Sequence, residues 1–320
     1  MLTLRAAAAA AAALFAVLTG AVPAAAQDDV PWSVATADGE FGSDRVNYNY
    51  TLDPGEQLTD GLVVTNNGSA PLELAVYAAD AFTTAQGKLD LLTRDTASTG
   101  VGAWVSPATG SVTVQPGQTS EVPFTLAVPA GATPGDRMGG IVTSLVQDGV
   151  ERRVGIRIRL RVGGALAPGV LAEDVRVDYS GGDAVLTYTV HNTGNAIVAV
   201  RQSASVSGPF GSWSRAADPV ADTPSLLPGE KWPVSVPVHG VVPAVWLTGS
   251  VTLTPLLTDA AGSTAVLPAV TTTGNGWAVP WVPLVIVLCG LVVVVFLVRR
   301  RTRNRKAAPR EEPAEPVPTA

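Results

Sequence analysis

Two kinds of tight turn recur along this chain, each lying between short runs rich in Val, Leu and Thr. The Pro-Gly turns are Pro54-Gly55, Pro116-Gly117 and Pro228-Gly229, and the Asn-x-Gly turns end in Asn67-Gly68 and Thr193-Gly194. Proline presets φ near −65° at the first corner, and glycine accepts the positive φ that a type II turn needs at the second. Turns at this spacing leave no room for long helices between them.

The runs between the turns alternate apolar residues with Thr, Ser or charged residues. Examples are LVVTNN, LELAVYAAD, SVTVQ, VPFTLAV, GIRIRLRV, DAVLTYTV, WPVSVPV and SVTLTPLL. Short alternating runs bounded by Gly, Pro and Asn predict half-buried β-strands. Turn signals every 8–12 residues are typical of a β-sandwich. The fold class predicted is therefore all-β.

Each half of the strand-rich region pairs an Asn-x-Gly turn with a Pro-Gly turn, which indicates a duplicated unit. We predict two immunoglobulin-like β-sandwich domains in tandem, 27–165 and 166–274, with the linker GGALAPG at 163–169. The alternative is one large sandwich. Trp and Phe side chains in the strands are expected to fill the cores.

The N-terminal residues 1–26 have the layout of a secretory signal peptide. Arg5 precedes an apolar Ala/Leu/Phe run, and Ala24-Ala25-Ala26 resembles a cleavage site. The alternative, a stable membrane anchor, is disfavoured because the apolar run is short.

A second apolar run near the C-terminus predicts one transmembrane helix over 277–298. Residues 278–298 carry no charge, and at about 1.5 Å per residue they reach about 30 Å, the thickness of the hydrocarbon core. Trp277 and Trp281 lie at one end, and a basic cluster follows from Arg299. Basic flanks stay cytoplasmic. The expected localisation is the cell membrane, single-pass, with the N-terminus outside and a basic, then disordered, cytoplasmic tail at 299–320.

Charge and cysteine content narrow the function classes further. The chain has a net charge of −6 although its C-terminal tail is basic, so the exported part is acidic and nucleic-acid binding is excluded. The single cysteine, Cys289, lies in the predicted span. It is interpreted as an apolar side chain rather than a palmitoylation site, and the exported domains are expected to fold without disulfides.

Catalytic and metal-binding patterns are not found in the sequence. The two histidines are His191 and His239, and neither belongs to a Cys/His cluster with zinc spacing. The nucleophile-elbow, zinc-protease and phosphate-loop motifs are missing as well. We therefore predict no enzyme activity, no cofactor and no metal site.

An arginine ladder is the first candidate binding site. In RRVGIRIRLRV, residues Arg153, Arg157, Arg159 and Arg161 share one face of a strand because side chains alternate with a period of two. One interpretation is a core strand with a solvated outer face. The other is a row of guanidinium groups that grips carboxylates or phosphates of a peptidoglycan stem or an anionic wall polymer.

A tyrosine pair is the second candidate. In DRVNYNYTLDPGE, Tyr48 and Tyr50 share one strand face, while Arg45, Asn47 and Asn49 share the other. The aromatic rings could stack on sugar rings, or the strand could simply pack one side into a core.

Several stretches resemble the WxL-interacting protein family. NYTLDPGEQLTDGLVVTNNGSAPLELAVYAADAFTTAQGKLDL resembles the first half of that family's peptidoglycan-binding domain, and VTVQPGQTSEVPFTLAVPAGATPGDRMGGIVTSL resembles the second half. The order of signal peptide, β-domain, second β-domain, span and basic tail is also similar. The resemblance covers about residues 30–165, whereas the second domain is only generically similar.

The resemblance implies a cell-surface protein of Gram-positive bacteria, with residue usage that suggests an actinobacterial member. Its first domain would bind peptidoglycan, and its second would bind a WxL-type surface protein or a host matrix protein. The main hypothesis is a non-enzymatic wall-binding scaffold or adhesin. The alternative is a protein-partner module without glycan affinity. The Pro-Gly strand pattern also resembles pilus-assembly chaperones, but those are soluble and the predicted span argues against that role.

Overall fold

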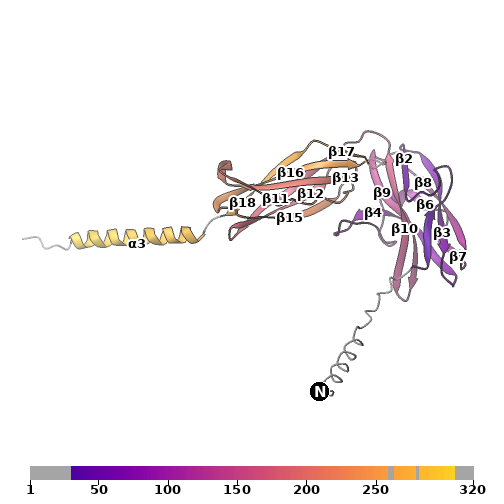
Figure 1. Ribbon diagram of the computed structural model, residues 1–320, viewed down its shortest axis with the longest axis horizontal. Helices are drawn as coiled ribbons and strands as arrows, with labels where there is room; N and C mark the ends of the chain where they lie inside the picture. Colours follow the sequence, from indigo (N-terminus) through magenta and orange to yellow (C-terminus); the bar gives the residue numbers. More distant parts are fainter. Residues whose placement is uncertain (1–29, 259–262, 279–280, 307–320) are drawn as a thin grey trace, which may run out of the picture. The chain divides into compact units, whose positions relative to one another are not determined.

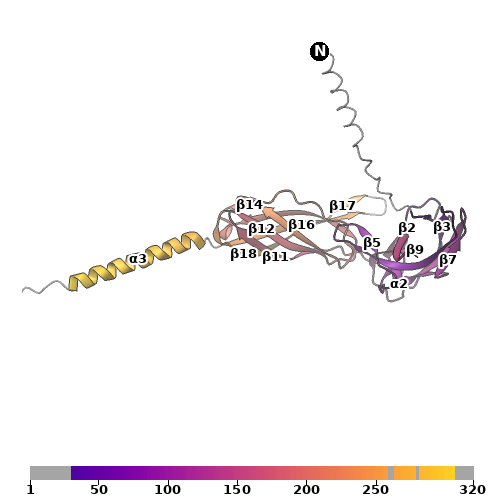
Figure 2. The same ribbon diagram turned by 90° about the horizontal axis from the view of Figure 1, so that it is seen from below.

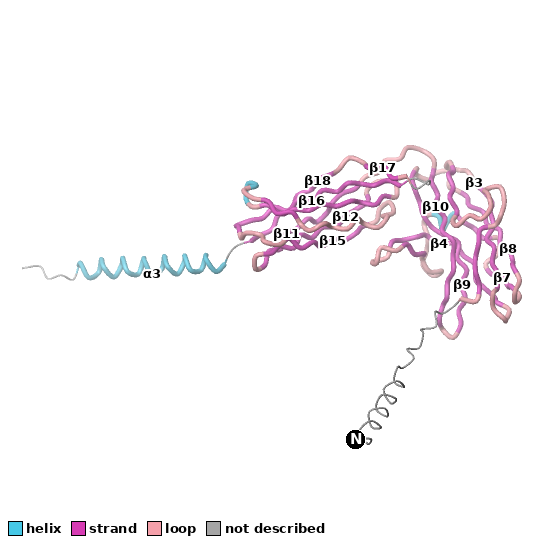
Figure 3. The backbone as a smooth tube through the Cα atoms, viewed as in Figure 1, coloured by secondary structure: helices cyan, strands magenta, loops and turns pink. Residues whose placement is uncertain are grey.

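The computed structural model describes residues 30–258, 263–278 and 281–306 (Figure 1). The predicted signal peptide and the tail from residue 307 lie outside the described residues. Most of the described chain is β-strand, so the all-β prediction is confirmed (Figure 3). The chain divides into two compact units. The first comprises the described residues up to 80 together with 91–131 and 138–159, and the second comprises 81–90, 132–137 and the described residues from 160 onward.

The first unit contains two sheets. The four-stranded sheet has the order β1 (Trp32–Thr36), β3 (Gln57–Asn66), β8 (Thr119–Ala127), β6 (Val105–Pro107). The six-stranded sheet has the order β2 (Tyr48–Leu52), β10 (Val150–Val162), β9 (Gly135–Gln147), β4 (Leu72–Thr83), β5 (Leu89–Leu91), and β7 (Ser111–Val114) also pairs with β4. Strands β4, β9 and β10 each continue into segments that belong to the second unit.

Side chains from the two sheets of the first unit meet in its interior. The indole Nε1 of Trp32 on β1 donates a 2.7 Å hydrogen bond to Thr143 Oγ1 on β9. The ring of Tyr48 on β2 contacts Phe124 on β8 edge-to-face, with centroids 5.2 Å apart. The sheets therefore pack face to face, as the sandwich prediction requires.

A one-turn helix, α2 (Val101–Trp104), belongs to the first unit (Figure 2) and is bonded to β4. The Asp80 carboxylate on β4 accepts hydrogen bonds from the backbone N–H groups of Thr99, Gly100 and Gly102, at 2.7–2.8 Å. These donors have no partner inside so short a helix, so the carboxylate fixes the helix to the strand.

The second unit also contains two sheets. The three-stranded sheet has the order β11 (Val170–Ser180), β12 (Asp183–Asn192), β15 (Lys231–Val238). The other has the order β14 (Ser214–Ala216), β13 (Val198–Ser207), β16 (Ala244–Thr258), β17 (Thr264–Val266), and β18 (Val270–Ala278) also pairs with β16. A short 3₁₀ turn, η1 (Pro209–Gly211), follows β13.

The core of the second unit follows the period-two pattern of its strands. Leu186 and Val190 on β12 and Val251 and Leu253 on β16 are fully buried and belong to one cluster. The alternate residues, such as Thr187, Thr189 and Thr252, lie on the opposite face, because successive side chains of a strand point to opposite faces.

A buried asparagine gives the recurring turns a common physical reason. In the first unit, Asn66 Nδ2 donates to the carbonyls of Ala70 and Val114 at 2.9 and 2.8 Å, and its Oδ1 accepts from Gly68 N at 2.8 Å. The backbone carbonyl of Asn66 accepts from Gly117 N, at 3.0 Å. The side chain thus ties the Asn-x-Gly turn to the Pro-Gly turn.

The second unit repeats this arrangement around Asn192. Its Nδ2 donates to the carbonyls of Ala196 and Leu226, both at 2.9 Å, and its Oδ1 accepts from Gly194 N at 3.1 Å. Its backbone carbonyl accepts from Gly229 N at 2.9 Å. Both asparagines are fully buried. The same set of bonds in both units agrees with the duplicated pattern seen in the sequence.

A long helix, α3 (Trp281–Lys306), follows β18. The predicted span 277–298 overlaps it but begins earlier, because Trp277 and Ala278 belong to β18, where Trp277 pairs with Trp246. Residues 279–280 of that span lie outside the described residues. Within the described residues, no helix has both the length and the apolar character of a membrane crossing.

Candidate functional site

The arginine ladder lies along β10 and, as predicted, on one face of the strand. Arg157 is exposed, while the other three are half-buried. The Arg157 Nε donates to Asn47 Oδ1 at 3.3 Å, and Arg153 donates to the Leu91 carbonyl at 3.1 Å. At least these two guanidinium groups therefore have partners within the chain.

Arg161, at the end of the ladder, has a structural role in the second unit. It donates two hydrogen bonds to the Asp136 carboxylate, at 2.7 and 3.1 Å, and this carboxylate is completely buried. Asp136 Oδ2 also accepts from the backbone N–H of Ile197, at 3.2 Å. Removing Arg161 would leave a buried carboxylate without its counter-charge.

The tyrosine pair faces the core rather than solvent. Tyr48 is 0% exposed and Tyr50 is 6% exposed. Their rings stack on each other with centroids 6.0 Å apart, and the Tyr48 hydroxyl donates to the Gly61 carbonyl at 2.7 Å. Rings buried in this way offer no face to a sugar, so the packing interpretation is the one that the structure supports.

A buried ion pair accompanies the tyrosines. Arg45 donates two hydrogen bonds to Asp60, at 2.7 and 3.0 Å, and Tyr50 donates to the same carboxylate. Burial alone would raise the pKa of Asp60, but the hydrogen bonds from Arg45, Tyr50 and the Gly61 backbone together hold that pKa below its usual value. Burial, followed by the bond to Asp60, raises the pKa of Tyr50 well above its ordinary value.

This depressed pKa predicts acid sensitivity of the first unit. The folded-state pKa of Asp60 lies below its unfolded-state pKa. The carboxylate therefore contributes its full stabilisation at pH values above the unfolded-state pKa, and this stabilisation is lost as the pH falls through the folded-state pKa. Asp60→Asn should lower the free energy of unfolding by about 3 kcal/mol at pH 7. Between about pH 5 and about pH 2 it should lose less stability than the wild type. Urea unfolding at a series of pH values measures both effects.

The exposed Asp53 provides the matched control. Asp53→Asn should leave both the stability at neutral pH and the acid profile close to those of the wild type. An Asp60→Asn profile parallel to the wild-type profile would show that the ion pair does not cause the acid sensitivity.

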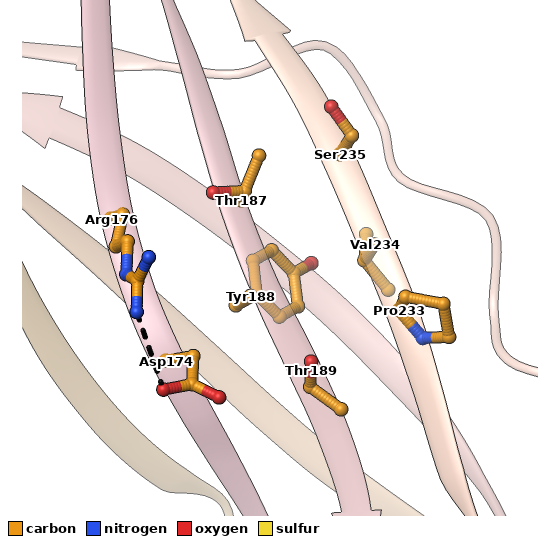
Figure 4. A pocket seen from close by; sticks show the side chains of 8 residues that line it. All are labelled: Asp174, Arg176, Thr187, Tyr188, Thr189, Pro233, Val234 and Ser235. Carbon is orange, nitrogen blue, oxygen red and sulfur yellow. Dashed lines mark ion pairs between the residues drawn. The ribbon is translucent and has the colours of Figure 1, made fainter.

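A shallow groove on the second unit is the candidate functional site. It has a volume of about 390 Å³ and crosses β11, β12 and β15 side by side (Figure 4). Its lining residues are Asp174, Arg176, Thr187, Tyr188, Thr189, Pro233, Val234 and Ser235. In the strand register, Arg176 pairs with Thr187 and Thr187 with Ser235, so one row of polar side chains crosses the whole sheet.

An irregularity in β11 places the charged residues of the groove. The register of β11 against β12 shifts between Glu173 and Arg176, and Asp174 has a φ of 53°. Such a bulge redirects side chains at the edge of a sheet. The Asp174 Oδ1 and Arg176 Nη2 atoms lie 3.8 Å apart, and both side chains are more than 70% exposed. This exposed pair keeps most of its hydrogen-bonding capacity available to a ligand.

A small charged network lies one residue row beyond the groove. Glu173 accepts from His191 Nδ1 at 2.6 Å and from Lys231 Nζ at 2.7 Å, which links all three strands. The hydrogen bonds from Lys231 and then from His191 lower the pKa of Glu173. His191, for which the sequence predicted no metal-binding role, thus lies on the same face as the groove.

The free edge of β15 is poorly suited to accept another strand. Asn192 N donates to the Glu230 carbonyl, so residue 230 directs its backbone groups toward β12. Hydrogen-bonded residues alternate with non-bonded ones along an antiparallel ladder. Residues 233 and 237 therefore direct their backbone groups away from β12, toward the free edge. Both are prolines, which have no N–H to donate. A ligand is therefore expected on the face of the sheet rather than on this edge.

The sequence did not single out the groove residues. The outward positions of DAVLTYTV carry Thr187 and Thr189, and this alternation was the one available signal. Within the described residues, no group of three or more His, Cys, Asp or Glu side chains could hold a metal ion.

No family model matches the sequence, and no curated protein matches it. Among solved structures, the chain is similar to the YadV chaperone, with 11% identity, a TM-score of 0.34, and coverage of 76% of this chain and 100% of that one. It is similar to the Pseudomonas aeruginosa CupB2 chaperone, with 11% identity, a TM-score of 0.31, and coverage of 74% and 99%. It is also similar to a complex of the Salmonella enterica SafA pilin with the SafB chaperone, with 11% identity, a TM-score of 0.32, and coverage of 76% and 96%. Likenesses this weak carry no inference about function.

Proposed function

We propose that this chain is a non-enzymatic cell-surface module that binds an extended segment of a protein partner. The observation that carries the proposal is the groove of the three-stranded sheet, which crosses three strands and is lined by hydroxyl groups and an exposed charge pair. Neighbouring strands lie about 4.8 Å apart, so the groove accommodates a short stretch of extended polypeptide.

The open shape of the groove favours a protein over a small molecule. Small-molecule sites enclose most of the ligand's surface. This groove is shallow, and beside Tyr188, Pro233 and Val234 it presents Thr187, Thr189, Ser235 and the Asp174–Arg176 pair. Hydroxyl groups can bond main-chain amides of a partner, while Asp174 and Arg176 can pair with its charged side chains.

Binding of the chain to the cell wall remains a secondary prediction. A grip on peptidoglycan or a wall polymer needs available guanidinium groups, and Arg153 and Arg161 are engaged inside the chain. Arg157 is the most exposed member of the ladder and is the position at which an anionic polymer would bind. Membership of the WxL-interacting family, and with it a WxL-type partner, likewise stays a prediction.

Membrane anchoring is also part of the proposal. In α3 the apolar side chains from Leu284 to Val298 are all exposed, with fractions between 46% and 65%. Apolar side chains around a whole helix favour a lipid environment over water. We expect the N-terminal domains outside the cell and the basic C-terminal tail inside, as the Arg299–Arg301 cluster indicates.

Photo-crosslinking in intact cells tests the partner proposal. With a photoreactive amino acid at Thr187, we expect a discrete crosslinked protein that persists after the wall is digested. At Thr252, on the opposite sheet, we expect none. Arg176→Gln should lower the crosslinking yield about threefold, which is the change in affinity expected when one exposed ion pair with the partner is lost.

Arg201→Gln is the matched control for that variant, because Arg201 lies 3.9 Å from Asp222 and is similarly exposed on the other sheet. The crosslinking yield of Arg201→Gln should equal that of the wild type. If the chain crosslinks only to glycan, or if the crosslinked complex disappears when the wall is digested, the protein-partner proposal is wrong and wall binding is favoured.

A further inference from the structure

Exposed apolar side chains gather at one end of the second unit. Phe210 is 94% exposed, Trp277 75%, Val245 53% and Val242 51%. We call these residues, together with the half-buried Trp246, the end patch. Single exposed apolar residues are ordinary on a protein surface, whereas a group that includes two aromatic residues exposed to this extent marks an interaction site.

The topology brings the end patch together from three segments. Ser207, the last residue of β13, pairs with Thr248 near the start of β16, and Ala278, the last of β18, pairs with Ala244. The ends of β13 and β18 and the start of β16 therefore coincide. Figure 3 shows η1, a short cyan segment, at this end of the unit.

The backbone turns the most exposed ring outward. Phe210 has a φ of 55°, a conformation that non-glycine residues adopt uncommonly. Its ring lies edge-to-face against Trp246, with centroids 5.4 Å apart. Trp246 pairs in turn with Trp277 across β16 and β18. The three aromatic residues are thus neighbours in the fold, and Val242 and Val245 lie just before Trp246 in the sequence.

The chain itself identifies the surface that this patch meets. β18 ends at Ala278 and α3 begins at Trp281, so Trp277 lies four residues before a helix whose apolar side chains are all exposed from Leu284 to Val298. Aromatic side chains with an apolar body and a polar tip favour the headgroup zone of a bilayer. Arg215, which donates to the Gly240 carbonyl at 3.3 Å, adds a cation beside the loop that contains Val242.

We propose that the end patch inserts into the headgroup region of the membrane to which the chain is anchored. The inference rests on the proposed anchoring, and it adds that the second unit contacts the lipid surface instead of standing free of it. Phe210 enters deepest because its ring is the most exposed, and Arg215 pairs with lipid phosphate.

A fluorophore at single positions tests this insertion in the full chain. Because Cys289 is the only cysteine, Cys289→Ser combined with Phe210→Cys gives one site for an environment-sensitive label. The labelled protein is reconstituted into vesicles of phosphatidylcholine and phosphatidylglycerol. We expect a blue-shifted emission that spin-labelled lipids quench severalfold more strongly than at the control position.

Val266 provides the control position. It is 64% exposed and pairs with Leu256, near the opposite end of β16, so a label there should show the emission of a probe in water. Trp277→Ser should reduce the blue shift at position 210, because it removes a neighbouring anchor.

The outcomes separate the two proposals. If the protein floats with the vesicles but positions 210 and 266 have the same water-like emission, the insertion is wrong and the anchoring stands. If the protein does not float with the vesicles, both the anchoring and the insertion are wrong.

Discussion

Replacing Asn192 with alanine is expected to lower the free energy of unfolding of the second unit by about 3 kcal/mol. The side chain is fully buried and donates to two carbonyls while accepting from Gly194 N. Alanine would leave these buried backbone groups without the partner that joins the two turns, and each buried group left unpaired costs about 1–3 kcal/mol. Urea unfolding followed by amide hydrogen exchange in β12 and β13 measures the loss within this unit.

The neighbouring Thr193 is the control, because it occupies the same turn and is exposed. Thr193→Ala should change the free energy of unfolding by less than about 0.5 kcal/mol. Asn66→Ala should reproduce the Asn192 effect in the first unit, with its loss of protection confined to strands such as β3 and β8. A loss below about 1 kcal/mol for both asparagine variants would show that these bonds do not hold the turns together.

Replacing Gly276 with alanine is expected to destabilise the second unit by about 3 kcal/mol, because overpacking against rigid backbone cannot be relieved by a rotamer change. A Cβ at this position would lie 1.8 Å from the Val177 carbonyl oxygen, and one at Gly274 would lie 1.9 Å from that of Val175. These two glycines of β18 let its backbone approach β11, a strand of the other sheet. Amide hydrogen exchange should show β11 and β18 losing protection first.

Gly110 is the matched control, since a Cβ there meets no atom within 4 Å and its φ is not positive. Gly110→Ala should have a free energy of unfolding close to that of the wild type. Wild-type stability of Gly276→Ala would mean that β11 and β18 can separate without cost.

Local pattern was sufficient to place strands and turns. The runs DAVLTYTV, WPVSVPV and SVTLTPLL lie within β12, β15 and β16. The segment GGALAPG, predicted as the linker between the domains, lies between the end of β10 at Val162 and the start of β11 at Val170, within the second unit. The strand and turn predictions succeed because proline, glycine and the alternation of side chains act on neighbouring residues.

The candidate site was much less predictable. Tyr48 and Tyr50 were correctly assigned to one face of a strand, yet only the packing of β2 against β8 makes that face the inner one. Arg161 belongs to a periodic ladder, but its partner Asp136 is 25 residues away in the sequence. Arg176, Thr187 and Ser235 meet in one groove because three strands from different parts of the chain share a register.

The difference in predictability between the strands and the candidate site has one physical reason. Turn chemistry and side-chain alternation depend on dihedral preferences of adjacent residues, so the all-β class and the repeated pairing of Asn-x-Gly with Pro-Gly are already present in the amino-acid order. Which face is buried, which charges are paired and which strands lie side by side depend on contacts between residues far apart in the chain. The groove, the occupied arginines and the aromatic group around Phe210 therefore emerged only from the folded chain.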